Sequence, residues 1–215
     1  MTNQRIPLTL FGALTVGNLI SVATGLSTLE WLTKPLLMPM LIVLVLVSGG
    51  LAHHHARLMV FGLATATIAD IALLIDTDLA FLIGMGFFLI MQAGYITVFV
   101  KLGAGNGVRR RPWLIPALLV FLAAFFIPLW SELGDFAVPM ALYGLALAGM
   151  ALFAIGLSTR TGIGGVLFLI SDLLIGINVG GLDFPGRGVI IMTTYIAAQY
   201  LLITGWFRVT TPSRE

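Results

Sequence analysis

Apolar runs of about 20 residues follow one another along almost the whole sequence, separated only by short polar connections. A helix of this length crosses the hydrocarbon core of a bilayer. Only 9% of the 215 residues are charged, whereas about 25% are charged in soluble domains. Polar and apolar residues do not alternate as they do in the strands of a membrane barrel. The sequence therefore predicts an all-α integral membrane protein that forms one polytopic domain over residues 1–215.

The apolar runs predict a compact bundle of eight transmembrane helices, in which short connections make neighbouring helices antiparallel. The first run is too long for the core of a signal peptide and has no convincing cleavage site, so we expect it to be retained. The predicted spans are residues 7–26, 34–51, 57–76, 79–101, 112–130, 137–158, 162–180 and 188–208.

The charged residues of the connections indicate an orientation. With the N-terminus in the cytoplasm, nine of the eleven Lys and Arg residues face inward, and only Lys34 and Arg187 face outward. The acidic residues of the connections face outward, except for Glu215. Because the Lys and Arg bias sets orientation, we expect both termini in the cytoplasm and a bacterial inner membrane location. Basic residues spread over so many short connections make no nucleic-acid surface, and the oligomeric state stays open.

Two carboxyl groups lie within the predicted spans. Asp70 is part of "LATATIADIALLI", and Asp172 is part of "GGVLFLISDLLIGINVG". An ionised Asp at the bilayer centre costs about 3 kcal/mol or more, so an acid at this depth indicates a function by default. The two spans run in the same direction and place the acids at similar depths. We therefore expect both carboxyls to share one cavity.

A few other polar side chains are candidates for lining this cavity. Lys34, at the outer entrance of the second span, can extend down toward the acids. Tyr195 and Gln199 are spaced i, i+4 and share one face of the last span. For the polar residues Asn18, Gln92 and Asn178, a hydrogen bond to a neighbouring helix is the alternative to a functional role. The predicted substrate-binding residues are Lys34, Tyr195, Gln199, Gln92, Tyr95 and Asn18, whereas Tyr143 and Asn178 are polar residues at depth without an assigned role.

The histidines do not indicate a metal site. His53, His54 and His55 are consecutive, so on a helix they point in different directions. No histidine lies near Asp70 or Asp172 along the chain, and the sequence contains no cysteine. A catalytic zinc usually has three protein ligands. We therefore expect neither a metal nor another cofactor.

Five segments occur in an order that a known family shares. They are "TKPLLMPML" at 33–41, "LATATIADIALLI" at 63–75, "FLIGMGFFLIMQAGYI" at 81–96, "GGVLFLISDLLIGIN" at 164–178 and "MTTYIAAQYLLITG" at 192–205. Together they resemble the YhhN-type lysoplasmalogenase family of multi-span membrane enzymes. The resemblance implies a lysophospholipid substrate from the bilayer and hydrolysis of its vinyl-ether bond to a fatty aldehyde and a glycerophospho-base. It also implies that Asp70 and Asp172 are the catalytic pair. Ala69 and Gln92 stand where the family usually has Gly and His.

Paired carboxyls suit the cleavage of a vinyl ether, which is stable to base and labile to acid. A proton adds to the carbon beta to the oxygen and leaves an oxocarbenium ion, which water attacks. Burial and a neighbouring carboxylate both favour the protonated form of an acid, and such a pair can hold one proton between them. Our hypothesis is that Asp172 donates the proton and that ionised Asp70 stabilises the cation. Lys34 then binds the substrate phosphate, and Tyr195 with Gln199 orders water.

Two other functions use the same residues. A small-molecule or proton-coupled transporter also contains buried acids, and it predicts uptake or proton flux without product release. A non-catalytic lipid-binding protein predicts that both aspartates can be replaced by Asn without loss of function.

Overall fold

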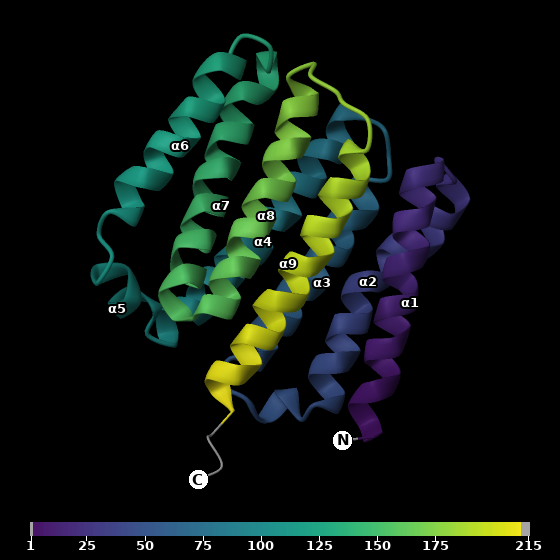
Figure 1. Cartoon of the computed structure of the whole chain (residues 1–215), viewed down its shortest axis with the longest axis vertical. Coiled ribbons are helices and arrows are strands. Elements are labelled where there is room, and N and C mark those ends of the chain that lie inside the picture. Colours follow the sequence, from purple (N-terminus) through teal and green to yellow (C-terminus); the bar gives the residue numbers. More distant parts are fainter. Residues whose placement is uncertain (1, 212–215) are drawn as a thin grey trace. The chain divides into compact units, whose positions relative to one another are not determined.

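The computed structural model describes residues 2–211 (Figure 1), which form nine α-helices, two short 3-10 helices and no strand. The elements are α1 (Thr2–Thr24), α2 (Ser27–Val47), η1 (Gly50–Ala52), α3 (Ala56–Ala72), α4 (Asp78–Lys101), α5 (Ala104–Arg109), α6 (Leu114–Leu129), η2 (Gly134–Phe136), α7 (Ala137–Leu157), α8 (Thr159–Val179) and α9 (Arg187–Thr210).

The chain divides into two compact units. Unit 1 comprises residues 1–98 and 203–215, and it contains α1 to α3, most of α4 and the last turns of α9. Unit 2 comprises residues 99–202, and it contains α5 to α8, the end of α4 and the greater part of α9. The single domain over residues 1–215 stays a prediction.

Short connections make consecutive helices antiparallel neighbours in unit 1. Only Gly25 and Leu26 separate α1 from α2, and Gly25 adopts a φ of +71° that favours glycine at this tight reversal. α2 packs against both α1 and α3. Their apolar residues form buried faces that include Leu37, Leu41 and Leu63. Polar residues on these faces are therefore held at depths that the turns determine.

In unit 2, α7 and α8 form a hairpin with a single connecting residue, Ser158. Ser158 is extended, and its Oγ accepts a hydrogen bond from the Thr161 backbone N–H, which caps the start of α8. The Thr161 hydroxyl donates to the Ala154 carbonyl oxygen at 2.7 Å, which ties the first turn of α8 to the last turn of α7. A Cβ on Gly165 would lie 2.9 Å from Ala151 Cα, so small residues allow the two backbones to pack closely.

The short helix α5 packs against α7 through glycines. A Cβ placed on Gly107 would lie 2.0 Å from the backbone oxygen of Gly156, and a Cβ on Gly156 would lie 2.4 Å from the backbone oxygen of Ala104. The sequence pattern did not predict α5, because six residues rich in glycine have weak helix propensity. Close backbone contact with α7 stabilises the helix instead.

Six helices of the described residues are long and apolar enough to cross a membrane: α1, α2, α4, α7, α8 and α9. Large apolar side chains are exposed on the outer surface, with Val120 at 68% and Ile127 at 73%, as expected for contact with lipid rather than water. The chain is therefore an all-helical, multi-pass integral membrane protein. α3 and α6 are shorter, with 17 and 16 residues, so the eight spans stay a prediction.

The helices differ from the predicted spans mainly in their ends. α2 begins at Ser27, seven residues before the predicted start, and α3 ends at Ala72, four residues before the predicted end. The predicted start at residue 34 puts Pro35 in the first turn, but α2 contains Pro35 in its interior, as membrane helices tolerate. Lys34 therefore lies two turns inside α2 and is only 9% exposed, so its predicted place at a helix entrance was wrong.

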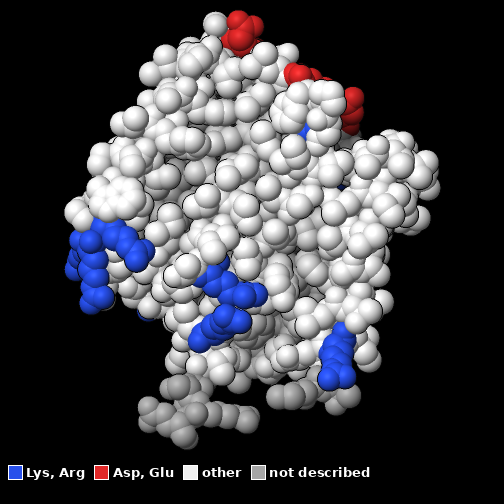
Figure 2. Space-filling model, in the orientation of Figure 1, with Lys and Arg blue, Asp and Glu red and all other residues white. Residues whose placement is uncertain are grey.

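Charges segregate between the two ends of unit 2. Figure 2 shows Lys and Arg side chains gathered around α5 and acidic side chains near the connection from α6 to α7. The basic residues are Lys101, Arg109, Arg110, Arg111 and Arg160, and the acidic residues of the connections are Glu132, Asp135 and Asp183. This distribution matches the predicted pattern, and the N-in, C-in orientation itself stays a prediction.

The acidic end of unit 2 contains an ion pair. Arg187 Nε donates a hydrogen bond to Asp183 Oδ1 at 2.7 Å. This hydrogen bond holds the pKa of the Asp183 carboxyl below its usual value, and a second hydrogen bond from the Phe184 backbone N–H acts in the same direction. Asp183 is thus kept ionised in the connection before α9, close to where that helix begins.

Candidate active site

Asp172 is half-buried in the second half of α8, and the hydroxyl of Tyr143 on α7 donates a hydrogen bond to its Oδ2. Tyr143 and Asp172 are almost equally far from Ser158 along the chain, the first before it and the second after it. In an antiparallel hairpin, residues equally distant from the turn lie at the same depth. The one-residue turn therefore sets the register that brings the phenol to the carboxyl.

The predicted residues of α9 lie at different distances from Asp172. The Ser171 hydroxyl donates to the Ile191 carbonyl oxygen at 3.1 Å, so Ile191 marks the level of Asp172 on α9. Tyr195 lies one turn further along and stacks edge-on against Phe168, with ring centroids 5.5 Å apart. Gln199 is fully buried two turns beyond Ile191, about 12 Å along the helix. Tyr195 is thus the nearer of the two to the level of Asp172.

In unit 1, Asp70 is buried in α3, with 2% of its surface exposed. Lys34 lies on α2, which packs against α3. Lys34 precedes the end of α2 at Val47 by nearly the same stretch of helix by which Asp70 follows the start of α3 at Ala56. These counts place the two buried side chains at a similar level of the neighbouring helices α2 and α3, although Lys34 is not at the helix entrance.

Asn18 lies at this level too. Its Nδ2 donates to Thr33 Oγ1 at 3.2 Å, and Thr33 immediately precedes Lys34. Asn18 is fully buried, and its Oδ1 has no hydrogen-bond partner among the described residues. The predicted alternative for Asn18, a hydrogen bond to a neighbouring helix, is confirmed for the nitrogen only. The oxygen stays available to a polar group that reaches the level of Lys34 and Asp70.

Gln92 and Tyr95 lie further along α4 than the level of Asp70. A Cβ on Gly84 would contact Leu73 and the Ala69 backbone, so Gly84 marks the level of Asp70 on α4. Gln92 and Tyr95 follow about two and three turns later, about 12 and 16 Å along the helix. Tyr95 packs on Gly62. Gln92 is fully buried, and in the described part of the chain neither atom of its amide has a hydrogen-bond partner.

The histidines do not take part in this site. His53 contacts the rings of Trp206 and Phe207, and its Nδ1 lies 3.1 Å from Thr210 Oγ1. His55 adopts a φ of +65° immediately before α3. Within residues 2–211, no three His, Cys, Asp or Glu side chains are grouped so as to hold a metal ion.

Each unit therefore contains one layer of polar candidate residues. Unit 2 provides Asp172 with Tyr143, and unit 1 provides Asp70 at the depth of Lys34 and Asn18. Because Asp70 and Asp172 belong to different units, their meeting in one cavity stays a prediction. Each layer contains a carboxyl group and other polar side chains at its level, and such groups can serve in general acid–base catalysis.

Two residues of these layers had no predicted role: Tyr143, which was expected only as a polar residue at depth, and Thr33. Both hydrogen bonds that involve them, Tyr143 to Asp172 and Asn18 to Thr33, join residues nearly equidistant from a tight turn. Counting outward from Ser158 and from Gly25 predicts both pairs. The signal was present in the sequence, but it requires the turn positions to within one residue.

Comparison with known proteins identifies the family to which this sequence is similar. Residues 29–206 match the model of the YhhN family. The chain is 31% identical over 134 residues to proteins of Mycobacterium bovis and Mycobacterium tuberculosis named "Lysoplasmalogenase", covering 60% of this chain and 51% of theirs. It is 35% identical over 88 residues to "Lysoplasmalogenase TMEM86B" of Sus scrofa, covering 40% of this chain and 39% of the pig protein. The chain thus spans about half the length, or less, of these curated relatives. No solved structure matches it. Since the family model covers most of the sequence, the chain belongs to the YhhN family.

Proposed function

We propose that this protein is a lysoplasmalogenase-type hydrolase that cleaves the vinyl-ether bond of a lysophospholipid. Membership of the YhhN family and the names of the similar proteins support this activity. The observation that carries it is the hydrogen bond between Tyr143 and Asp172 inside an apolar hairpin. Placing a carboxyl group among apolar helices costs free energy, so we infer that this carboxyl has a chemical role.

In the proposed reaction, Asp172 is the proton donor, and Asp70 is the carboxylate that faces the cation formed by the proton transfer. Asp172 protonates the vinyl carbon beta to the ether oxygen, and ionised Asp70 stabilises the resulting oxocarbenium ion. Water adds to the cation and returns a proton to the pair, and the hemiacetal collapses to a fatty aldehyde and the glycerol hydroxyl. The Tyr143 hydroxyl donates to Oδ2 of Asp172 and is proposed to orient this carboxyl for the proton transfer.

We propose roles for the remaining polar residues from their positions along the helices. Lys34, at the depth of Asp70, is proposed to bind the substrate phosphate, and the unpaired Oδ1 of Asn18 accepts a hydrogen bond from the head group or water. Tyr195, one turn from the level of Asp172, orders the attacking water. Gln92, Tyr95 and Gln199 lie further along their helices and are proposed to contact the substrate away from the scissile bond.

We also propose the number of spans and the orientation of the protein in its membrane. We propose that α3, with 17 residues, and α6, with 16, complete eight spans, since about 17 residues is the short end of the range for a crossing helix. Both termini face the cytoplasm of a bacterial inner membrane, as the segregation of charge favours. The single-chain substrate enters sideways from the bilayer, so that its tail stays in an apolar environment.

The direct test is an assay of the purified full chain with a 1-alkenyl lysophospholipid. We expect release of a fatty aldehyde, measured by coupling to an aldehyde dehydrogenase, and no hydrolysis of a 1-acyl lysophospholipid of the same chain length. Uptake of substrate or proton flux in liposomes without any aldehyde would contradict the proposal and favour a transporter.

Replacing Tyr143 by Phe tests the role of the hydrogen bond. We expect kcat to fall about 10- to 100-fold with little change in KM, because one hydrogen bond to a charged or proton-sharing carboxyl is lost. The pH at which activity falls by half should also move, since the hydroxyl interacts differently with the two forms of Asp172. Tyr200→Phe is the matched control, because the ring that contacts Arg160 is kept. An unchanged pH profile in Tyr143→Phe would leave the phenol only a packing role.

A further inference from the structure

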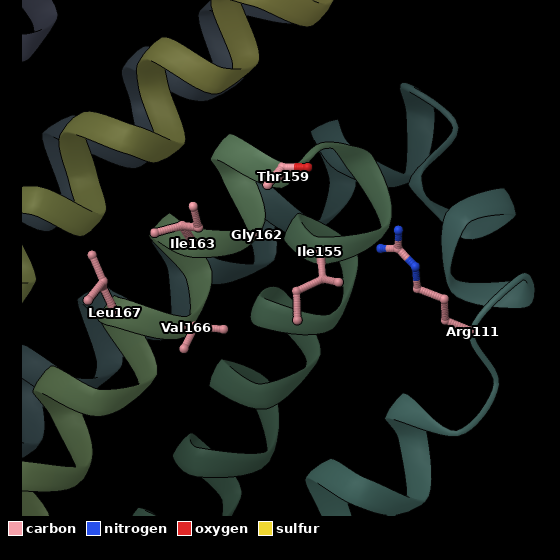
Figure 3. A pocket seen from close by; sticks show the side chains of 7 residues that line it. All are labelled: Arg111, Ile155, Thr159, Gly162, Ile163, Val166 and Leu167. Carbon is pink, nitrogen blue, oxygen red and sulfur yellow. The ribbon is translucent and has the colours of Figure 1, made fainter.

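A cavity of about 420 Å³ opens at the basic end of unit 2 (Figure 3), where α7, α8 and a connection meet. This volume falls in the range of small-molecule sites, about 300–1,000 Å³. Its lining comes from α7, from the first half of α8 and from the connection between α5 and α6. The lining residues are Arg111, Ile155, Thr159, Gly162, Ile163, Val166 and Leu167.

The cavity has one apolar and one cationic part. Ile163 and Val166 are 51% and 39% exposed on a membrane-type helix, so the apolar part opens toward the acyl chains of the bilayer. At the other part, Figure 3 shows the guanidinium group of Arg111 turned toward Ile155 and Thr159. Within the part of the chain that the structure describes, this guanidinium forms no ion pair and donates no hydrogen bond.

This cavity is distinct from the carboxyl site on the same helix. Thr159, Ile163 and Val166 follow one face of α8. Asp172 lies nine residues beyond Ile163, and nine steps of about 100° place it half a turn away, on the opposite face. The axial distance is also about 13 Å. A molecule in the cavity therefore does not reach the carboxyl of Asp172 through α8.

The surroundings of the cavity are those of a membrane interface rich in positive charge. Trp113, two residues after Arg111, is 63% exposed, and exposed Trp side chains gather where hydrocarbon meets head groups. Arg109 and Arg110 extend the basic surface, which attracts anionic lipids. The close contact of Gly107 with Gly156 fixes α5 on α7 and thereby positions the connection that holds Arg111.

We propose that this cavity binds an anionic phospholipid from the surrounding leaflet. Arg111 donates paired hydrogen bonds to the lipid phosphate, for which its planar fork is suited. Ile155, Ile163 and Val166 contact the upper part of one acyl chain. The site is separate from the hydrolysis proposed above, so its test needs no enzymatic activity.

The first experiment compares two lipids on the purified full chain in dodecyl maltoside. Dioleoylphosphatidylglycerol should raise the melting temperature saturably and remain bound in native mass spectrometry, whereas dioleoylphosphatidylcholine should do neither at equal concentration. Equal effects of the two lipids would overturn the requirement for an anionic head group. If inorganic phosphate displaced the anionic lipid and raised the melting temperature equally, the cavity would be a phosphate site, and the proposal of a lipid ligand would be wrong.

Paired variants then separate the cavity from the general basic surface. Arg111→Gln should weaken phosphatidylglycerol binding about tenfold, and Arg109→Gln, which removes the same charge outside the cavity, should weaken it by about twofold or less. Val166→Phe narrows the apolar part and should also weaken binding, whereas Ile170→Phe, with the same 39% exposure one turn along α8, should not. Equal losses in Arg111→Gln and Arg109→Gln would overturn the proposal, as would competition by the lysophospholipid substrate.

Discussion

Asp172→Asn and Asp70→Asn are each expected to lower kcat for aldehyde release by about 10³-fold, because an amide of nearly the same shape cannot transfer a proton. Binding of the substrate should change little. The measurement is the initial rate of aldehyde formation by purified variants whose melting temperatures and elution profiles match the native protein. Asp135→Asn, which changes an exposed acid in η2, should retain the native rate and is the matched control.

The double variant distinguishes a shared proton from two independent roles. If both carboxyls serve one proton transfer, Asp70→Asn combined with Asp172→Asn should be about as slow as either single variant, since residues that act as a unit are not additive. Losses that multiply would indicate separate functions. A native rate in either folded single variant would remove that residue from the proposed mechanism.

Gly107→Ala is expected to lower the free energy of unfolding by about 3 kcal/mol or more, the upper range for forcing extra atoms into a packed interior. The new Cβ would lie 2.0 Å from the backbone oxygen of Gly156, and a backbone atom cannot move aside as a side chain can. Fluorescence-detected melting in detergent measures the loss, which should be accompanied by reduced yield from membranes.

Gly105→Ala is the control for this change in the same short helix. A Cβ on Gly105 meets nothing within 4 Å, and alanine has a better helix propensity than glycine by about 1 kcal/mol. Gly105→Ala should therefore leave stability unchanged or raise it slightly. Equal melting temperatures for the two variants would show that α5 does not depend on close contact with α7.

Hydropathy predicted the helices well where a long apolar run ends at charged residues. The span expected at 79–101 corresponds to α4 from Asp78 to Lys101, and the span at 137–158 corresponds to α7. Prediction was poorer for the span expected to begin at residue 34, since α2 begins at Ser27 and contains Pro35 in its interior. Hydropathy also cannot predict α5, which depends on the contact between Gly107 and Gly156, two residues far apart in the sequence.

The candidate site was predictable in part, because polar side chains at depth are few. Asp70 and Asn18 were identified from their place inside apolar runs, and both are buried. Lys34 was expected at a helix entrance, but it is buried as well. Which of them lie at one level depends on the register between helices, and an error of one turn moves a residue by about 5 Å. For that reason Gln92 was placed with the acids although it lies about two turns from the level of Asp70.

The one-residue turn at Ser158 limits how the sequence of the hairpin can change in length. Inserting a single residue between Tyr143 and Ser158 would rotate the phenol by about 100° around α7 and shift it by about 1.5 Å, which would separate it from Asp172. The connection from Gly180 to Gly186 lies outside this stretch, so added residues there leave the pair in register. We therefore expect changes in length to preserve the contact between Tyr143 and Asp172 in the connection from Gly180 to Gly186, but not between Tyr143 and Asp172.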